Sequence, residues 1–509
     1  MIEVGSTKQL FADDELIDSM GDVFQVLNPG RKHPDNPLLT ADQPWEGPAI
    51  CCDCTSLHDP TARSKERFRL WYQSLQIGEW EDKDYPGCLY AHSQDGIHWV
   101  KPDLGVTNLN GNLHNNAVWV NNSRGWRSTQ GISCNPDEID PNRRYSMLCF
   151  MGTDEPKVTR PGYSAFFSGD GIHWHPYEGN PVLPDYDHVT LCEVLTTTYN
   201  EQSKCPRPSH PLDRWRYYCS AKYSSWMCPP VANDFYGYMR RTAGLRTSND
   251  FVHWSPNHLV LQPDELDDFL ARQRIMKASP VLHYSQPEGH RAEFYGMGLL
   301  PYGDILLGLL WVYDPSGKGD NKQEGPIQLQ LTGTRDLVRW KRLGQRMPLL
   351  ESGQPDQWDC GLILPCNRPL IVGNEIWLYY GGCNQGHAAD SETTGAIGLA
   401  TWRLDGFVSI NANKYPGKLT TKPLKFSGRS LVINYSTSAA GNIRVELQDE
   451  NGSPLPGYAL DDCRGMCGDE IEQTVQWKGG EDVSSLISRP VCLHFEMTHA
   501  KLFSFRFVD

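Results

Sequence analysis

Apolar and aromatic residues gather in short runs that turn residues separate over most of the chain. Each run has the length of a β-strand, and three runs follow one another before the pattern starts again, as in "GPAICCDCTSLHDP", "RFRLWYQSL" and "CLYAHSQDGIHWVKP". β-Branched and aromatic residues in runs of this length predict strands. Only residues 262–277 show a convincing helical pattern. The pattern therefore predicts an all-β fold.

One turn sequence marks the end of four of these units. "SQDGIHW" ends at Trp99, "SGDGIHW" at Trp174, "TSNDFVHW" at Trp254 and "TGTRDLVRW" at Trp340, so successive tryptophans are 75, 80 and 86 residues apart. Spacings of this length fit a four-stranded unit with long loops. A fifth unit runs from "WDCGLILPCNRPLIVG" to "GAIGLATWRLDGFVSI" without the His-Trp ending. Five such sheets arranged radially predict a five-bladed β-propeller.

The repeated turn has a structural explanation. Asp or Asn followed by Gly closes a tight hairpin because Gly accepts a positive φ, and the Trp that follows returns as a strand residue that packs between blades. The alternative is that His98, His173 and His253 contact a ligand directly. We favour the structural role, because these hairpins are expected at the outer edge of each blade, away from the axis.

The pattern changes after residue 410. Residues 417–463 and 473–509 alternate apolar and polar positions over short strands that Gly, Asn and Ser turns separate, as in a β-sandwich. We therefore predict two domains, a propeller over residues 1–412 and a C-terminal β-sandwich over residues 413–509. An appended sandwich either binds carbohydrate or caps one face of the propeller, and the sequence favours neither.

Charge and hydropathy narrow the class of partner. The 509 residues carry a formal net charge of −15. Nucleic acid and anionic membrane surfaces require clustered Lys and Arg, so neither is expected and a neutral or cationic ligand fits better. No window approaches the roughly 18 apolar residues of a membrane span, and the N-terminal stretch lacks the layout of a signal peptide. The chain is therefore expected to be cytoplasmic unless a leader has been removed, and no pattern predicts its oligomeric state.

The 16 cysteines are scattered along the chain and lack the even spacing of a disulfide framework. This predicts reduced, mostly buried thiols. Zinc is the alternative at "CCDC" (residues 51–54) and "CRGMC" (residues 463–467), but neither motif has a partner pair at zinc-site spacing. No cofactor is expected. A structural Ca²⁺ on the propeller axis stays open, because no ligand set can be read from spacing.

Several stretches in a fixed order carry a resemblance that spans nearly the whole chain. They are "LFADDELID", "PWEG" at residues 44–47, the "DGIHW" turns, "WLYYGGCNQGHA" at residues 377–388, "LDGFVSI" and "GKLTTKPLKFSG". In these stretches the sequence resembles the five-bladed propeller glycoside hydrolases, the superfamily of families 32, 43, 68 and 117. It is most similar to a group described as resembling the family 32 N-terminal domain. The resemblance implies a carbohydrate substrate and a general acid that is a Glu on the third blade.

Glycoside hydrolysis requires two carboxyl groups flanking the scissile bond. The resemblance makes Glu193 in "TLCEVLTT" the general acid, and its apolar neighbours suit a carboxyl that must hold a proton. Glu46 in "PWEG" or Asp53 in "CCDC" is the predicted base or nucleophile. Asp359 in "QWDCG", which repeats the Trp-acid pattern of "PWEG", orients the sugar. The alternatives are a surface carboxylate at Glu46, a buried hydrogen-bond acceptor at Asp53 and a structural ion pair at Glu193.

The second blade departs from the superfamily pattern. Family 32 has "RDP" at this point, whereas this chain has "HNNAVW" and "NPDEIDP". Asp137 is one candidate for the missing group. Asn115 and Asn116 are the other candidates, so the identity of the polar group on this blade stays open.

Residues suited to sugar contacts lie near the predicted ends of the inner strands. Aromatic rings provide platforms for sugars, and a few convergent polar groups fix the orientation of a ligand. His387 follows a Gly-rich turn, and its alternative role is that of an ordinary loop histidine. The predicted substrate-binding set is Trp45, Asn116, His188, Glu293, Tyr295, Trp358 and His387.

The favoured function is a glycoside hydrolase that acts on an unidentified oligo- or polysaccharide. A glycoside phosphorylase is the first alternative and needs at least two inward cations, for which Arg272, Arg274 and Lys277 form the visible cluster. A non-catalytic carbohydrate-binding propeller is the second alternative. The motifs GxSxG, HExxH, GxGxxG and the Walker loop do not occur, so serine, zinc-peptidase, dinucleotide and P-loop chemistry are not expected.

Overall fold

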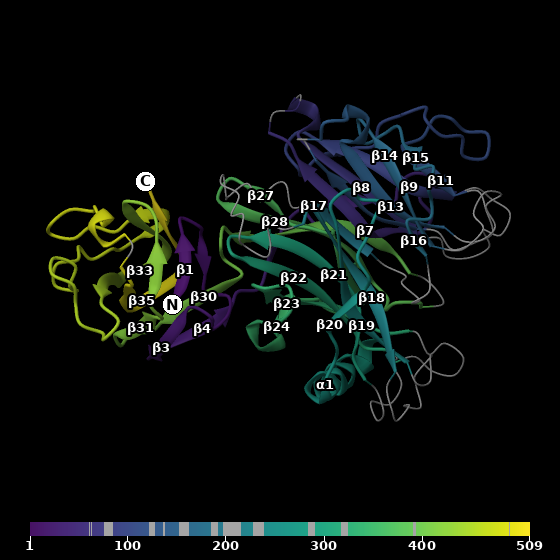
Figure 1. Cartoon of the computed structure of the whole chain (residues 1–509). Helices are drawn as coiled ribbons and strands as arrows, with labels where there is room; N and C mark the ends of the chain where they lie inside the picture. The colour runs from purple at the N-terminus through teal and green to yellow at the C-terminus, as the bar shows by residue number, and fades with distance from the viewer. Residues whose placement is uncertain are drawn as a thin grey trace.

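The fold was analysed in a computed structural model of the chain. It describes residues 1–60, 62, 64–75, 85–121, 128–135, 138–151, 162–184, 192–196, 215–226, 239–282, 291–316, 324–389, 393–487 and 489–509. β-Strands make up most of the ordered structure, and α1 (Glu265–Leu282) is the single α-helix among these residues (Figure 1). The predicted all-β class is confirmed. Within the same residues, no helix is long and apolar enough to cross a bilayer.

Most strands fall into antiparallel runs, which we name after their first strand. The β7 run contains β7 (Ala49–His58), β8 (Phe68–Leu75), β9 (Tyr85–Ser93), β10 (Trp99–Val100) and β11 (Ala117–Asn121). The β12 run contains β12 (Ser128–Cys134), β13 (Tyr145–Met151), β14 (Gly162–Ser168), β15 (His175–Pro176) and β16 (Leu183–Pro184). The β17 run contains β17 (Cys192–Thr196), β18 (Tyr217–Trp226), β19 (Met239–Ser248) and β20 (His258–Leu261).

Two further runs follow along the chain. The β21 run contains β21 (Glu293–Tyr302), β22 (Ile305–Tyr313), β23 (Ile327–Thr334), β24 (Lys341–Arg342) and β25 (Pro348–Leu350). The β26 run contains β26 (Leu362–Pro365), β27 (Leu370–Val372), β28 (Glu375–Cys383) and β29 (Gly395–Arg403). Its outer edge is completed from the start of the chain by β5 (Arg31–Lys32) and β6 (Leu39–Thr40), which pair with β29.

The first strands of these runs lie next to one another. Strand β7 contacts β12, β12 contacts β17, β17 contacts β21, and β26 contacts β7. Single parallel pairs also join three of the runs into one 16-stranded sheet, at Ile327↔Leu362 and at Gly395↔Ala49. The first strands therefore gather together, and the later strands of each run lie farther out.

Each run is buried on both faces. In β8, Leu70 and Tyr72 pack in a core shared with the β26 run, whereas Trp71 packs in a core shared with the β12 run. Tyr217 and Tyr218 of β18 divide in the same way between cores shared with the β12 and β21 runs. Because successive side chains of a strand point to opposite faces, a strand buried on both faces reads as a continuous apolar run. This explains sequences such as "RLWYQSL".

The repeated turns join neighbouring runs. Asp95 accepts hydrogen bonds at 2.8 Å from the backbone N–H groups of Ile97 and His98. The carbonyl oxygen of Gly96, which has φ +79°, accepts a hydrogen bond at 2.8 Å from the hydroxyl of Tyr379 in the β26 run. The corresponding turns are closed in the same way by Asp170, Asp250 and Asp336. The first turn is thus a clamp between the adjacent β7 and β26 runs.

The histidines of the first three turns contact the aspartates that close those turns. The Nδ1 atoms of His98 and His173 each lie 2.7 Å from Oδ2 of the aspartate in their own turn, Asp95 and Asp170. His253 makes the same contact with Asp250 at 2.6 Å. These contacts support the structural role predicted for the turn rather than a direct ligand contact.

The two ends of the chain fold together in a separate unit (Figure 1). An eight-stranded sheet combines N-terminal and C-terminal strands, and β1 pairs with β32 in a second sheet. Residues 2–27 therefore share sheets with the C-terminal strands, although the sequence-based division assigns residues 1–412 to the propeller. The strands of this unit are β1 (Ile2–Gly5), β2 (Gln9–Leu10), β3 (Ile17–Gly21), β4 (Val23–Leu27), β30 (Val408–Ala412), β31 (Gly417–Thr421), β32 (Leu424–Phe426), β33 (Ser430–Gln448), β34 (Asp469–Thr474) and β35 (Cys492–Val508).

A buried carboxylate connects this unit to the β21 run. Asp405 accepts hydrogen bonds from Ser504 at 2.6 Å and Asn434 at 2.9 Å, which lie in β35 and β33. It also pairs with Lys8 at 3.0 Å and bonds the hydroxyl of Tyr302 at the end of β21. The side chain of Asp405 is fully buried, so each of these partners is needed to offset its desolvation.

Candidate active site

Glu293 opens β21 and is buried with a charged partner. Only 2% of its side chain is exposed, and its Oε2 accepts a hydrogen bond from Nη1 of Arg241 in β19, which is 8% exposed. The ion pair therefore connects the β21 run to the β17 run. Burying two charges is unfavourable unless they neutralise each other, so this pair holds both side chains in one arrangement.

Two tyrosines lie beside the arginine of this ion pair, and a histidine contacts both tyrosines. The guanidinium of Arg241 lies 5.7 Å from the ring centre of Tyr295 and 5.6 Å from that of Tyr313. The hydroxyl of Tyr295 and Nε2 of His387 are 2.7 Å apart, and the Tyr313 and His387 ring centres are 5.2 Å apart. The predicted residues Glu293, Tyr295 and His387 thus belong to one cluster.

Backbone contacts fix the position of His387. It follows β28 in the β26 run, and its N–H donates a hydrogen bond at 2.7 Å to the carbonyl of Gly325, just before β23. The N–H of Gly325 donates back to the His387 carbonyl at 3.2 Å. The backbone of His387 is therefore held by two hydrogen bonds that join the β26 run to the β21 run. We name Arg241, Glu293, Tyr295, Tyr313 and His387 the Glu293 cluster.

A second arginine and carboxylate lie close in the fold to this cluster. Arg274 of α1 donates from Nε and Nη2 to the two carboxylate oxygens of Asp314, at 2.7 and 2.8 Å. Asp314 directly follows Tyr313 at the end of β22. Arg274 belongs to the cation cluster that the sequence suggested for a phosphorylase, and this two-point contact already neutralises its charge.

The first strands of three runs are irregular. The pairing register shifts between Cys51 and Thr55 in β7, between Thr129 and Ile132 in β12, and between Phe294 and Gly296 in β21. Bulges of this kind turn side chains out of the regular alternation and occur often beside active sites. Tyr295 and Asp53 both lie within such a shift.

For Asp53 and Glu193, the two other acids predicted on first strands, the structure describes the backbone but not the side chain. Asp53 lies in β7, and Glu193 is the second residue of β17, paired with Ser220. Their side chains lie outside the described part of the structure. His188 and Asp137 lie outside the described residues altogether. The catalytic roles of Asp53 and Glu193 stay predictions.

Glu46 is fully buried and uses both carboxylate oxygens. Oε2 accepts hydrogen bonds from Nζ of Lys101 at 2.7 Å and from the backbone N–H groups of Asp42 and Gln43 at 2.9 Å. Oε1 accepts a hydrogen bond from the hydroxyl of Tyr72 at 2.6 Å. Burial and the neighbouring carboxylate raise the pKa of Tyr72 well above its usual value, so this hydroxyl remains a donor.

The predicted residues Trp45 and Asn116 complete the surroundings of Glu46. Nε1 of Trp45 donates to Oδ1 of Asn116 at 2.8 Å, and Nδ2 of Asn116 donates to the Tyr72 hydroxyl at 2.7 Å and to the Tyr90 carbonyl at 2.8 Å. Asn115 is likewise occupied, because its side chain bonds the backbone of Thr107 and Ala117. The side-chain amides of Asn115 and Asn116 therefore form hydrogen bonds with other groups of the protein.

Asp359 has corresponding surroundings in the β26 run. Its Oδ2 accepts hydrogen bonds from Nζ of Lys32 at 2.6 Å and from the hydroxyl of Tyr380 at 2.9 Å, and only 2% of its side chain is exposed. Trp358 stacks on Tyr380 with ring centres 5.5 Å apart. An acid, a lysine and a tyrosine therefore recur in two runs, as the sequence echo between "PWEG" and "QWDCG" suggested.

Sequence reasoning did not find Arg241, Tyr72, Lys101 or Lys32. The pair "RR" in the strand-like stretch "YMRRTAG" is a signal that could have found Arg241. An arginine on a buried strand requires a buried acid as its partner. Lys32 in β5 and Lys101, just after β10, lie far in sequence from their acids, and no local pattern connects them.

No metal centre is formed by the described residues, in which no group of three or more His, Cys, Asp or Glu side chains is arranged to hold an ion. Cys463 and Cys467 are free thiols. The Ca²⁺ considered from the sequence stays untested.

No protein-family model matches the chain. No curated protein matches it by sequence either.

Several solved structures are similar in fold. An N-acetylgalactosamine deacetylase from F. plautii, in complex with blood group B trisaccharide, is 14% identical with a TM-score of 0.40, over 75% of this chain and 96% of that one. A glycosyl hydrolase from Bacteroides ovatus is 12% identical with a TM-score of 0.43, over 74% and 94%. A family 43 arabinoxylan arabinofuranohydrolase from Bacillus subtilis is 11% identical with a TM-score of 0.39, over 93% and 97%. Two of these three structures are described as glycoside hydrolases and the first as a deacetylase.

Proposed function

We propose that the chain is a glycoside hydrolase built on a five-bladed β-propeller with an appended β-sandwich. The β7, β12, β17, β21 and β26 runs are the proposed blades. Their contacting first strands and the cores shared between consecutive runs support this arrangement. In a propeller, the first strands surround the axis, so polar side chains from several blades converge there.

The Glu293 cluster is the observation that carries the proposal. It gathers a carboxylate, an arginine, two tyrosines and a histidine from three runs around the start of a first strand. Aromatic rings beside a few fixed polar groups are the usual composition of a small-ligand site. The Tyr295 hydroxyl and the His387 ring are polar groups of the kind that contact sugar hydroxyls, and Arg241 holds the Glu293 carboxylate in place.

Glu193 is the proposed general acid, with Asp53 as base or nucleophile. Both lie on first strands, and Asp53 lies within the register shift of β7. Of the two acids predicted for this second role, Glu46 is less suited because it already accepts four hydrogen bonds inside the protein. Glu46 and Asp359 are proposed as positioning residues that hold their blades in register.

The proposal is tested by screening wild type, Glu193→Gln and Asp53→Asn against a panel of oligosaccharides, with product analysis. Loss of either catalytic carboxyl should lower kcat by about a hundredfold or more, since general acid–base catalysis contributes on that order. Asp250→Asn, a change in a surface turn, is the matched control and should retain activity. Unchanged turnover by Glu193→Gln would remove Glu193 as the acid.

The same screen separates the other functions. Products that form only when inorganic phosphate is added would identify a phosphorylase, although Arg274 is already paired with Asp314. Binding of oligosaccharides without any turnover by wild type would identify a carbohydrate-binding propeller.

A further inference from the structure

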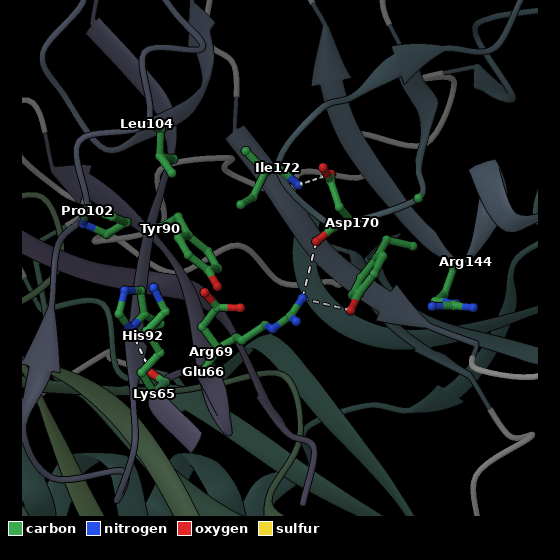
Figure 2. Close-up of a pocket in the computed structure, with 12 residues that line it drawn as sticks. Lys65, Glu66, Arg69, Tyr90, His92, Pro102, Leu104, Arg144, Asp170 and Ile172 are labelled. Carbon is green, nitrogen blue, oxygen red and sulfur yellow. Dashed lines mark hydrogen bonds between the residues drawn. The ribbon is translucent and has the colours of Figure 1, made fainter. Parts of the chain in front are cut away.

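A polar cavity of about 400 Å³ lies between the β7 and β12 runs (Figure 2). None of its lining residues belongs to the Glu293 cluster. Its wall includes Arg69 near the start of β8, His92 near the end of β9 and Asp170 in the second repeated turn. Phe68 pairs with Ser93 at this end of the run, whereas Ala49 pairs with Leu75 at the other end, where β7 begins. The cavity is therefore at the opposite end of the strands from the first residues of β7.

Arg69 is held at the centre of this wall. Its Nη1 donates hydrogen bonds to the hydroxyl of Tyr145 at 3.0 Å and to the carbonyl oxygen of Asp170 at 3.2 Å, both drawn as dashed lines in Figure 2. Nη2 has no hydrogen-bond partner among the described residues. The guanidinium is thus fixed in orientation by one nitrogen while the other is left for a ligand, and an arginine held in this way loses little entropy on binding.

Further donors of the wall are also unused. The Nζ of Lys65, the guanidinium of Arg144 and the hydroxyl of Tyr90 make no hydrogen bond or ion pair with any described residue, and all three residues line the cavity. Burial raises the pKa of Tyr90 to about 12, so its hydroxyl stays protonated and can donate. The cavity therefore has several unpaired donors.

The acids of the wall do not balance these cations. Asp170 directs its carboxylate into its own turn, where it accepts from the N–H groups of Ile172 and His173 at 2.8 and 2.9 Å and contacts the His173 ring at 2.7 Å. Glu66 is the other acid of the wall. Three cations, Lys65, Arg69 and Arg144, thus face one carboxylate, that of Glu66, whose charge acts on Arg69 and Tyr90. The cavity is therefore rich in cations although the chain has a net charge of −15.

We propose that this cavity binds an oxyanion, either the carboxylate of an acidic sugar or a sulfate or phosphate group. A guanidinium with a free edge, an ammonium and a phenol match the oxygen geometry of such groups, and hydrogen bonds between charged partners are the stronger kind. The cavity is also large enough for a monosaccharide, whose ring would lie beside Tyr90 and Tyr145. The site is separate from the proposed catalytic centre and does not depend on its activity.

The test is calorimetric titration of the full chain with D-glucuronate, sodium sulfate, inorganic phosphate and D-glucose. Binding of D-glucuronate more tightly than sulfate or phosphate identifies an acidic sugar as the ligand. Binding of sulfate or phosphate alone identifies an inorganic oxyanion or its ester. Binding of D-glucose as tightly as D-glucuronate, or no binding of any anion at tens of millimolar, overturns the proposal.

Variants locate the site. Lys65→Met and Arg144→Met should each weaken anion binding about tenfold, with little effect on folding because both side chains are exposed. Arg489→Met, an exposed arginine of the C-terminal unit, is the matched control and should bind as wild type does. Anion affinity unchanged in both cavity variants would place binding elsewhere and overturn the proposal.

Discussion

Tyr72 and Tyr380 hold equivalent carboxylates in two different strand runs. Tyr72 donates its hydroxyl to Glu46 at 2.6 Å, and Tyr380 donates to Asp359 at 2.9 Å. In both cases a lysine completes the contact, either Lys101 just after β10 or Lys32 in β5. The arrangement indicates that these carboxylates connect the inner and outer strands of a run.

Removal of the Glu46 charge should destabilise the fold. Glu46→Gln removes the buried one of the two carboxylates that pair with Lys101, whose side chain is 8% exposed, and leaves Asp42 at 2.6 Å. The loss should therefore be smaller than the roughly 3–5 kcal/mol for breaking an isolated buried pair. Urea unfolding measures the loss. The double variant Glu46→Gln/Lys101→Met should recover part of it. A Glu46→Gln protein of wild-type stability that has lost turnover would instead place Glu46 in catalysis.

The Arg241 and Glu293 pair should behave as a unit. Glu293→Gln and Arg241→Met should each lower stability by about 3 kcal/mol, and the double variant by clearly less than the sum, because each single change removes the oppositely charged neighbour of a buried charge. A double-mutant cycle by urea denaturation measures the coupling. Additive losses would mean that the two side chains do not support each other.

Gly96 should tolerate no side chain. A Cβ there would lie 2.6 Å from the Tyr379 hydroxyl and 2.8 Å from the Trp377 ring, at a φ of +79°. Gly96→Ala is expected to cost about 2–4 kcal/mol from the left-handed backbone and the overlap together. Gly111→Ala is the matched control, since its φ is +91° but nothing lies within 4 Å of the added carbon. Its cost should be about 1–2 kcal/mol in the same thermal unfolding measurement. Equal losses would show that the clamp has no tight contact at Gly96.

The turn aspartates should make the fold sensitive to acid. Burial acts to raise the pKa of Asp170 and Asp250, but hydrogen bonds from the turn outweigh it and lower each pKa to about 2. Because the folded pKa lies below the unfolded value, their contribution to stability is present above about pH 4 and is lost as the pH falls toward 2.

The aspartate variants test this directly. Asp170→Asn and Asp250→Asn should each lower stability at pH 6 by about 0.5–1 kcal/mol, a range set by the loss of a capping carboxylate on the surface. The difference from wild type should shrink at pH 2.5, where the wild-type carboxylates are partly protonated. Urea unfolding at both pH values measures this change, and a constant difference would contradict it.

Local patterns predicted much of this fold. The continuous apolar strands follow from burial on both faces, and the "DGIHW" turns from the hydrogen bonds of Asp95 and its counterparts. The two Trp-acid motifs also proved to have corresponding surroundings at Glu46 and Asp359. Contacts between residues far apart in the sequence could not be predicted from local patterns. The lysine partners and the Arg241 contact depend on the order of the sheets in space, and "IEVG" and "IDSMG" are too short and mixed in polarity to reveal their C-terminal partners.

The pairing of β1 to β4 with the last strands of the chain has a consequence for how the protein is made. During synthesis, residues 2–27 emerge well before their partners β30, β31, β32 and β35, which become available only after the five strand runs have been translated. β5 and β6 likewise remain without their partner until β29 of the β26 run is made. Contacts so distant in sequence close slowly. The leading strands therefore stay unpaired through most of translation, with their backbone edges open to chaperones or to another nascent copy.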